Sequence, residues 1–422
     1  MARKLSKKKI SLWLLLFAVI IFFSCGGPRM VSTVIKSMNN KKSVKHVVRD
    51  ISVDRSLVQR LDSFVANTRR AGTLGVYVWD ATAGKEVYAF KADSLMRPAS
   101  NMKMLTCIAA LRILGPNFKY RSGVYTSGKL VGDTLRGNIA FKFNYDPWFT
   151  PDSLMRMTDV LRAKGIKAVK GNIIVDIKIQ DPMQHEQHWT PGDLKTRKLG
   201  ILYRGKRRVL SELKYALRAK GVNFKESQLV ESKLPKDMKK IGEITTPITD
   251  PIMRALLNSS NENAECLSYT MSGNFPQGQD FRVTGNDALK RFVKREMKIN
   301  PDKVAVIHDG SGLCVHDRIT SRFLVSLLRY AYSHKYINNV LLTYLPVSGE
   351  VGTLHRRMWR PELKGRIQAK TGTLTREDGI TSLSGYVKGN NGHQLLFAII
   401  QNEVPVADAR LWQDRFCSEF VK

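Results

Sequence analysis

Acidic side chains are scarce in this sequence. Its 422 residues include 36 Asp and Glu against 69 Lys and Arg, which gives a formal net charge of +33. Such an excess predicts anionic surroundings, which nucleic acid, acidic lipid or an anionic cell-wall polymer can supply. The basic residues are spread along the whole chain, without zinc-finger spacing or an aromatic RNA-binding strand. The charge therefore favours a membrane or wall polymer, and we expect no nucleic-acid partner.

Cysteine is scarce as well. The chain has five cysteines and none of them forms a CxxC pair, so neither a zinc site of that type nor a thioredoxin-like motif is supported. Cys107 and Cys266 lie in apolar helical segments, which predicts buried free thiols. Cys314 and Cys417 complete the four downstream cysteines, whose pairing the sequence leaves open because an exported protein can form disulfides.

No apolar run is long enough to span a bilayer. The run Ile10–Phe23 falls short of the ~20 residues that a transmembrane helix needs. It follows a basic segment, so we predict a signal peptide over 1–24 and a polar tether over 25–50. Ser24-Cys25 resembles a bacterial lipoprotein processing site, which would make Cys25 the lipidated first residue. Ordinary secretion and an uncleaved anchor are the alternatives, and all three predict export to the periplasm of a bacterial cell envelope.

The rest of the chain has the composition of a folded protein, with 43% hydrophobic residues. Periodicity and turn signals predict an α/β (α+β) fold in which helices flank an antiparallel sheet whose edges come from both ends of the chain. The expected strands are Leu74–Trp79, Lys85–Phe90, Gly365–Thr373, Thr381–Lys388 and His393–Gln401. The expected helices around them are Ser56–Arg70, Ser100–Leu114, Asp250–Thr270, Asn286–Met297, Ser321–Ser333 and Val406–Phe420.

The segment between these two parts differs in character. Over 117–249 the sequence predicts short strands at Gly137–Phe143 and Gly171–Ile177 and helices at Pro151–Lys164 and Val209–Lys220. We therefore expect residues 51–116 and 250–422 to form one domain, and 117–249 to form a smaller inserted subdomain.

Three short motifs supply the chemistry. In Ser100-Asn-Met-Lys103 the two named side chains share one face at the start of a helix, so Lys103 can take the proton of the Ser100 hydroxyl. A lysine acts as a base only where burial or nearby positive charge lowers its pKa. Alone, the pair is more simply a helix cap and a surface charge, since Ser is a preferred N-cap.

The second and third motifs lie far along the chain. Ser259-Ser-Asn261 offers a second hydroxyl for proton relay and an amide for a substrate peptide bond. Lys370-Thr-Gly-Thr373 offers a fixed positive charge, hydroxyls for a carboxylate, and a glycine that leaves room for a substrate along a strand edge. In this order the three motifs form the signature of penicillin-interacting serine enzymes.

A resemblance to a known family extends beyond these motifs. RPASNMK, NSSNENAE, HDGSGL, LPVSGEVGTL and AKTGTL resemble segments of the D-alanyl-D-alanine carboxypeptidase/endopeptidase family, the class C low-molecular-mass penicillin-binding proteins. The resemblance runs from about residue 55 to 420 and is weakest across 117–249. It implies a penicillin-binding-protein/β-lactamase-like fold, peptidoglycan peptides as substrates, covalent inhibition by β-lactams, and no cofactor.

The same resemblance implies roles for single residues. Ser100 would attack the carbonyl between two D-alanines while Lys103 accepts its proton, and the N–H groups of Ser100 and Thr373 would form the oxyanion hole. Ser259, linked to both lysines, would pass a proton to the leaving amine. Substrate binding would fall to Asn261 for the peptide backbone and to Lys370, Thr371, Gly372 and Thr373 for the carboxylate end. Asp176 aligns loosely with an acidic residue near the stem-peptide amine.

Two other patterns are weaker. His185-Glu-Gln-His188 is not an HExxH motif and has no evident third ligand, so we expect a surface loop and no metal site. His308-Asp-Gly-Ser311 could be mistaken for part of a catalytic triad, but Ser311 lacks the GxSxG context, and we expect a structural turn near the site.

Two alternative functions stay open. A β-lactamase or esterase would use the same serine and lysine, although the chain has no Glu-x-x-Leu-Asn segment and has Ser259 where class C β-lactamases carry Tyr. A non-catalytic, wall-binding envelope lipoprotein would keep the fold without the reaction, but all three motifs are intact.

Overall fold

The computed structural model describes residues 52–68, 72–184, 186–190, 192–272, 281–375 and 379–422. The expected signal peptide, the tether and Cys25 lie outside these residues. From Ser52 to Lys422 the chain forms one compact unit. Within the described ranges, no helix combines the length and apolarity that a membrane crossing requires.

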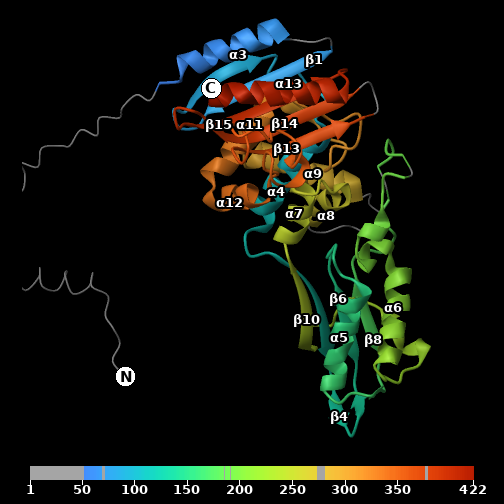
Figure 1. Cartoon of the computed structure of the whole chain (residues 1–422). Helices are drawn as coiled ribbons and strands as arrows, with labels where there is room; N and C mark the ends of the chain where they lie inside the picture. The colour runs from blue at the N-terminus through green and yellow to red at the C-terminus, as the bar shows by residue number, and fades with distance from the viewer. Residues whose placement is uncertain (1–51, 69–71, 185, 191, 273–280, 376–378) are drawn as a thin grey trace, which may run out of the picture. The chain divides into compact units, whose positions relative to one another are not determined.

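A five-stranded antiparallel sheet joins the two ends of this unit, in the order β13-β14-β15-β1-β2 (Figure 1). This arrangement confirms the predicted N-terminal hairpin, the three C-terminal strands and their union in one sheet. Strand β13 lies at one edge. The strands are β1 (Thr73–Asp80), β2 (Lys85–Phe90), β13 (Ile367–Leu374), β14 (Ile380–Lys388) and β15 (Gln394–Asn402).

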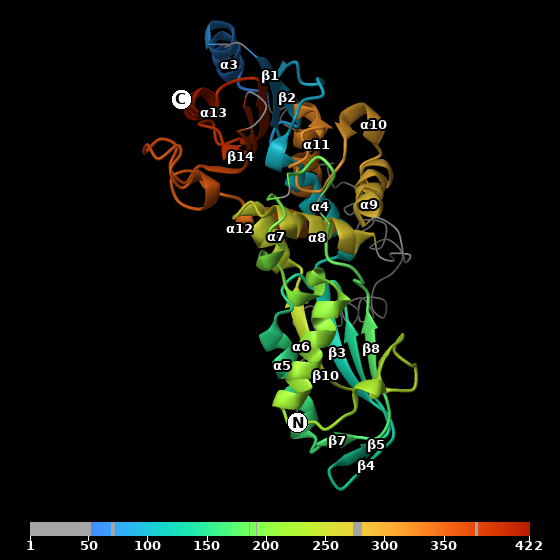
Figure 2. The same cartoon turned by 90° about the vertical axis from the view of Figure 1, so that its right-hand side faces the viewer.

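Helices cover both faces of this sheet because its strands are apolar on both sides. Alternate side chains of β15 enter different cores: Phe397 packs with α3 (Arg55–Thr68) and α13 (Val406–Ser418), whereas Leu396 packs with α4 (Met102–Leu114) and α11 (Ser321–Ser333). Figure 2 shows α13 and α11 on opposite sides of β14.

Helix α4 is the central helix of the larger core. Every residue from Met102 to Leu111 is buried, as expected for a helix that is apolar on all sides. Lys103 carries an amine in this otherwise largely apolar segment, yet it is buried as fully as its neighbours, with 0% of its surface exposed. The helix that carries the predicted base therefore places it away from water.

A second sheet lies within 119–247, with the order β10-β3-β6-β8-β9. Strands β6, β8 and β9 are parallel, and the helices α5 and α6 follow β6 and β8 in the chain. Its core is separate, although Cys266 and Tyr269 of the larger part join it. The elements are β3 (Lys119–Thr126), β6 (Ile139–Phe143), α5 (Pro151–Ala163), β8 (Ile173–Ile177), α6 (Lys206–Ala219), β9 (Leu229–Glu231) and β10 (Lys239–Pro247), with a small sheet of β4 (Lys129–Val131), β5 (Thr134–Arg136) and β7 (Ala168–Val169).

The predicted helix over Asp250–Thr270 is wrong in one respect, because two helices occupy it. The first ends at Leu256, and Ser260 caps the second by accepting a hydrogen bond from the Asn263 N–H. The prediction also missed α12. The remaining elements are α7 (Thr249–Leu256), α8 (Asn261–Met271), α9 (Phe281–Arg295), α10 (Pro301–Val304), β11 (Ala305–Val306), β12 (Arg318–Ile319) and α12 (Lys335–Tyr344), and the short helices η1 (Ala99–Asn101), η2 (Thr196–Lys198), η3 (Ile201–Arg204), η4 (Glu226–Gln228), η5 (Gly352–Leu354) and η6 (Glu419–Val421).

The four described cysteines are free and buried. This confirms the prediction for Cys107 and Cys266, and it answers the question that the sequence left open for Cys314 and Cys417.

Candidate active site

Ser100 lies in η1, the single turn that precedes α4. It caps neither helix with its side chain, since η1 begins after Pro98 and α4 after Asn101, both without a side-chain cap. The residue before it, Ala99, has φ of 46°, a left-handed conformation that is unfavourable for a residue with a side chain. Such local strain is typical of functional turns that the surrounding structure holds in place.

A glycine in a distant turn makes room for this strained residue. A Cβ built on Gly312 would lie 1.8 Å from the carbonyl oxygen of Ala99, so no other residue fits there. The turn of residues 308–314 therefore packs directly behind the serine.

Lys103 lies one helical turn after Ser100, and the structure brings the two side chains together. Its Nζ lies 2.9 Å from Ser100 Oγ, 2.7 Å from Asn261 Oδ1 and 2.8 Å from the Ser311 carbonyl oxygen. The amide and carbonyl oxygens can only accept hydrogen bonds. A neutral amine would thus donate its two N–H groups to them and turn its lone pair toward the serine hydroxyl.

The second motif reaches the site through the break between α7 and α8. Ser259 has φ of 54°, again a left-handed residue at a functional turn. Its Oγ accepts a hydrogen bond of 2.9 Å from Lys370 Nζ, and Lys370 also donates to the Thr371 carbonyl oxygen. The expected link from Ser259 to Lys370 is present. Lys103, the other lysine to which Ser259 was expected to be linked, donates a hydrogen bond to Asn261 of the same motif.

The third motif lies on the edge strand β13, directly beside η1. A Cβ on Gly372 would lie 2.6 Å from the Pro98 carbonyl oxygen and 3.1 Å from the Ser100 N atom. The space that this glycine leaves is thus filled by the chain's own turn. The expectation that Gly372 leaves room for a substrate is corrected: it lets β13 approach the serine.

The hydroxyl groups of β13 have partners that the sequence did not indicate. Thr371 Oγ1 lies 2.6 Å from Thr353 Oγ1, and Thr373 Oγ1 accepts a hydrogen bond of 3.0 Å from Arg410. Arg410 belongs to α13, so a guanidinium group lies beside the threonine expected to bind a carboxylate.

Asn101 is a further residue that the motifs did not single out. It is fully buried, and its Nδ2 donates to the Lys370 carbonyl oxygen at 3.1 Å and to Ser382 Oγ at 2.7 Å, while its Oδ1 accepts from Ser384. The side chain therefore ties the serine-bearing turn to both β13 and β14.

The 308–314 turn holds the other side of Lys103. Asp309 Oδ1 accepts from the N–H of Ser311 at 2.8 Å and from that of Gly312, and its Oδ2 accepts from the N–H of Cys314 at 2.7 Å. These bonds orient the Ser311 carbonyl toward Lys103. The expected structural turn near the site is present.

Burial sets the proton affinities of the charged groups. Burial lowers the pKa of Lys103 to about 8, with the charges of Asp309 and Glu265 acting in the opposite direction. Burial, and then the charge of Lys103, hold the pKa of Lys370 well below its ordinary value. In α8, burial raises the pKa of the Glu265 carboxyl to about 8.

A polar pocket adjoins the second motif. Ser259, Ser260 and Asn261 form part of its wall, and Trp148 and the loop at 192–198 of the second sheet's region form another part. The guanidinium of Arg254 stacks 3.7 Å from the Trp148 ring centre. Lys195 and Lys198 also line the pocket, together with two acidic residues, Asp193 and Glu262, and Glu262 lies 3.9 Å from Lys198.

Asp176 lies in the second sheet's region. It lies in β8, is buried, and accepts a hydrogen bond of 3.1 Å from the Leu234 N–H. Its expected role near the amine of a stem peptide stays a prediction.

The segment around His188 agrees only in part with the sequence interpretation. His185 lies outside the described residues, but Glu186 is buried, and His188 is half-buried against His308 and Cys314. Gln184 and Gln187 are exposed, in agreement with the predicted surface loop, but the expectation that no further ligand lies near is wrong, because His308 and Cys314 lie beside Glu186 and His188.

Known proteins resemble this arrangement in sequence and fold. A family model for the D-Ala-D-Ala carboxypeptidase 3 (S13) family matches residues 57–198 and 203–416. The D-alanyl-D-alanine carboxypeptidase DacB of Haemophilus influenzae is 19% identical over 404 residues, covering 76% of this chain and 83% of that protein. Carboxypeptidase DacB of Mycolicibacterium smegmatis is 25% identical over 378 residues, covering 82% and 80%.

The fold agrees with a solved structure. Penicillin-binding protein 4 (dacB) of Haemophilus influenzae superposes with a TM-score of 0.72 at 18% identity, over 86% of this chain and 99% of that one. This likeness confirms the predicted penicillin-binding-protein fold, and the family model covers most of the chain. The protein is therefore an enzyme that belongs to the D-Ala-D-Ala carboxypeptidase 3 (S13) family.

Proposed function

We propose that the enzyme cleaves the bond after a D-alanine in peptidoglycan stem peptides through an ester on Ser100. The observation that carries this proposal is the hydrogen-bond set of Lys103. Its two fixed acceptors, Asn261 Oδ1 and the Ser311 carbonyl oxygen, leave one Nζ direction, which meets Ser100 Oγ at 2.9 Å. A general base needs this hydrogen-bond reach to its proton.

In the first half-reaction, Ser100 Oγ bonds to the carbonyl carbon and its proton moves to Lys103 Nζ. The N–H groups of Ser100 and Thr373 stabilise the oxyanion, an effect of about 2.7–4 kcal/mol per donor where it has been measured. When the C–N bond breaks, the leaving amine takes the proton that Lys103 accepted, relayed through the hydroxyl of Ser259, which Lys370 holds at 2.9 Å. Water then attacks the ester, releases the peptide acid and returns a proton to Ser100.

The substrate's two ends meet different surroundings. Lys370, Thr371 and Thr373 bind the terminal carboxylate, and Asn261 holds the peptide backbone. The polar pocket adjoins Asn261, and its mixed basic and acidic lining can bind the polar groups of a peptide chain. Carboxypeptidase and endopeptidase cleavage share this acyl-enzyme and differ only in the leaving amine.

Fluorescent penicillin tests the nucleophile directly. The wild type should be labelled covalently, and Ser100→Ala should not be labelled at all, because the ester cannot form. Ser94→Ala, which changes an exposed serine shortly before the site, is the matched control and should be labelled like the wild type. Equal labelling of Ser100→Ala and the wild type would contradict the proposal.

A second measurement separates the reactions. Mass spectrometry of muropeptides after digestion should show loss of terminal D-alanine, loss of cross-linked dimers, or both. If the enzyme instead turned over a chromogenic β-lactam rapidly and left muropeptides intact, it would act as a β-lactamase.

We also propose that the protein is exported as a lipoprotein, tethered to a membrane of the cell envelope by residues 25–50. The support is the basic and apolar N-terminal sequence ending in Ser24-Cys25. Incorporation of labelled palmitate by the wild type, and its loss in Cys25→Ala, would agree with this. Incorporation that persists in Cys25→Ala would exclude it.

A further inference from the structure

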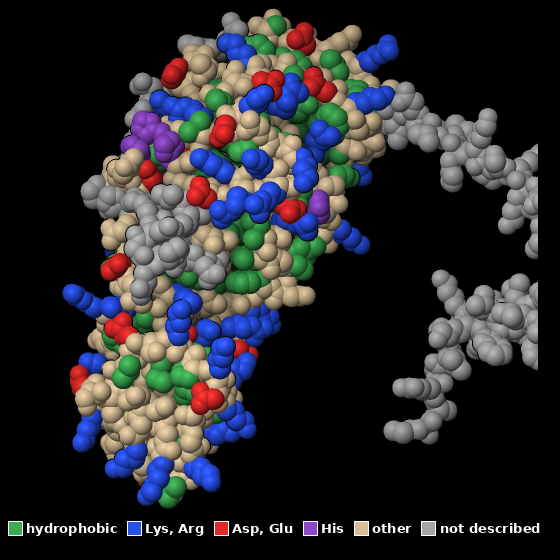
Figure 3. Space-filling model, turned by 180° about the vertical axis from the view of Figure 1, so that it is seen from behind, with side chains coloured by type: hydrophobic (Ala, Val, Ile, Leu, Met, Phe, Trp, Pro, Cys, Tyr) green, Lys and Arg blue, Asp and Glu red, His purple; other side chains and the backbone are tan. Residues whose placement is uncertain are grey.

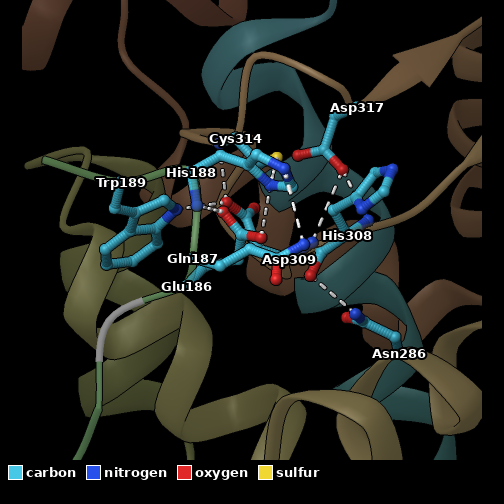
Figure 4. A network of polar contacts seen from close by, with 9 residues as sticks. All are labelled: Glu186, Gln187, His188, Trp189, Asn286, His308, Asp309, Cys314 and Asp317. Atoms are coloured by element: carbon cyan, nitrogen blue, oxygen red, sulfur yellow. Dashed lines mark hydrogen bonds and ion pairs between the residues drawn. The ribbon is translucent and has the colours of Figure 1, made fainter.

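Four side chains that the proposed reaction does not use converge beside the active site. Glu186 and His188 come from the loop before α6, and His308 and Cys314 come from the two ends of the turn behind Ser100 (Figure 4). One ligand atom of each lies within 4.8 Å of those of the other three. Figure 3 shows a patch of histidine side chains on one face of the protein. We propose that these four residues bind a Zn²⁺ ion.

The distances are near those of a tetrahedral zinc site. Cys314 Sγ lies 3.7 Å from His188 Nδ1. Zinc bonds of about 2.3 Å to sulfur and 2.0–2.1 Å to nitrogen separate two such ligands by roughly 3.5 Å. Glu186 Oε1 lies 2.7 Å from His188 Nδ1, a hydrogen bond that the ion would replace with two bonds of its own. The 2.7 Å pair would have to open by roughly 0.6 Å, and any pair at the 4.8 Å limit would have to close by roughly 1.3 Å.

The donor set also suits zinc in charge and softness. Thiolate and imidazole ligands favour Zn²⁺ over Mg²⁺ or Ca²⁺. When the ion binds, the Cys314 thiol loses its proton to solvent and both imidazoles bind through a neutral nitrogen. One thiolate and one carboxylate then balance the two positive charges. Since Glu186 and Cys314 are buried, a site without net charge avoids the cost of an unpaired buried ion.

The surroundings already orient these ligands. Trp189 follows His188 in the chain, and its Nε1 donates a hydrogen bond of 2.8 Å to Asp309 Oδ2. The His308 N–H donates to Asp317 Oδ1 at 2.7 Å, and the His308 carbonyl oxygen accepts from Asn286 at 2.6 Å (Figure 4). These bonds hold the main chain on both sides of the cluster.

Four protein ligands leave no open position, so the site is structural. The ion would join the loop around His188 to the turn that holds Ser311 against Lys103. It would thus brace the active site from outside without touching the substrate.

Metal binding can be tested on the purified full-length protein without an activity assay. After removal of metal with a chelator, Zn²⁺ should bind at one equivalent with a dissociation constant below roughly 1 µM. It should also raise the unfolding temperature. Co²⁺ in place of zinc should give a thiolate-to-cobalt charge-transfer absorption. A wild type that binds no zinc at this level would overturn the proposal.

Single substitutions test the ligand set. Cys314→Ser and His188→Ala should each weaken zinc binding by at least about 100-fold, since even changes outside the ligand shell cost 10–100-fold. Cys314→Ser should also lose the cobalt absorption. If Cys314→Ser fails to fold, His188→Ala, which truncates a half-buried side chain, still tests the site.

His316 supplies the matched control. Its ring lies 4.3 Å from that of His188, but its side chain is exposed and it is not among the four proposed ligands. His316→Ala should bind zinc as the wild type does. Zinc binding that survives in His188→Ala and Cys314→Ser but disappears in His316→Ala would show that these four residues are not the ligands.

Discussion

Two buried lysines of the active site, Lys103 and Lys370, have very different neighbours. Around Lys103, the charges of Asp309 and Glu265 offset part of the effect of burial, and the pKa of Lys103 falls to about 8. Around Lys370, burial and the charge of Lys103 both lower the pKa, and no carboxylate of the described residues offsets them. Carboxylates thus lie near Lys103 and raise its pKa, whereas no carboxylate of the described residues does so for Lys370.

This difference indicates different tasks. A group with a pKa near the working pH can accept and release a proton readily, which suits Lys103 as the base. Among the described residues, no carboxylate offsets the lowered pKa of Lys370. A substrate carboxylate bound at Thr371 and Thr373 would be such an anionic partner. We therefore expect the charge of Lys370 to depend on the ligand, because a carboxylate bound beside it would raise the pKa of Lys370.

The largest expected effect comes from removing the base. Lys103→Met keeps much of the side-chain volume but cannot accept a proton, so the acylation rate constant should fall by about 10²–10⁴-fold. The fall should be similar for substrates with and without a terminal carboxylate. Stopped-flow measurement with a fluorescent β-lactam and an amidated peptide would check this. A fall confined to carboxylate substrates would exchange the roles of the two lysines.

The pH dependence of the wild type should follow the same lysine. Because the neutral amine is the base and its pKa is about 8, kcat/KM should rise by about tenfold per pH unit below pH 8 and level off above it. The change between pH 6 and 8 is about 50-fold, and that between pH 6 and the plateau is about 100-fold. A profile that is flat over this range would show that Lys103 is already neutral, or that another group takes the proton.

Lys370→Met should have a smaller and more selective effect. It removes a charged hydrogen-bond donor from the carboxylate site, a loss of about 1.5–3 kcal/mol, or roughly 10–150-fold in kcat/KM. Peptides with a free carboxylate should lose this factor, whereas their amidated forms should lose much less. The ratio of the two substrates is the measurement. Equal losses for both would mean that Lys370 acts in proton transfer.

Much of this site was predictable because its reactive residues lie in short local motifs. The pair Ser100 and Lys103 depends only on helical spacing, and the structure places their polar atoms 2.9 Å apart. The hairpin, the C-terminal strands and their common sheet followed from alternating apolar residues and turn signals. Patterns of this kind involve neighbours in sequence.

The supporting contacts were not predictable, because they join distant segments. Lys103 bonds to a carbonyl oxygen 208 positions away, and Cys314 lies beside a histidine 126 positions away. A main-chain acceptor has no sequence signature. The need for glycine at position 312 was not predictable from sequence either, because it depends on the Ala99 carbonyl oxygen against which Gly312 packs. For the same reason, His188 seemed to lack partners until the fold supplied them.

Arg410 should give the smallest effect, and it separates carboxylate binding from the charge of Lys370. Its guanidinium donates to Thr373 Oγ1 at 3.0 Å from the exposed surface of α13, where a charge contributes about 0–1 kcal/mol. Arg410→Gln should therefore raise KM for carboxylate peptides by up to about fivefold and leave kcat unchanged. Arg415→Gln, an exposed arginine of the same helix, is the matched control and should change neither. If Arg410→Gln instead matched Lys370→Met in its loss of carboxylate selectivity, the exposed guanidinium would be the main anion partner, and the buried Lys370 would be left with proton transfer.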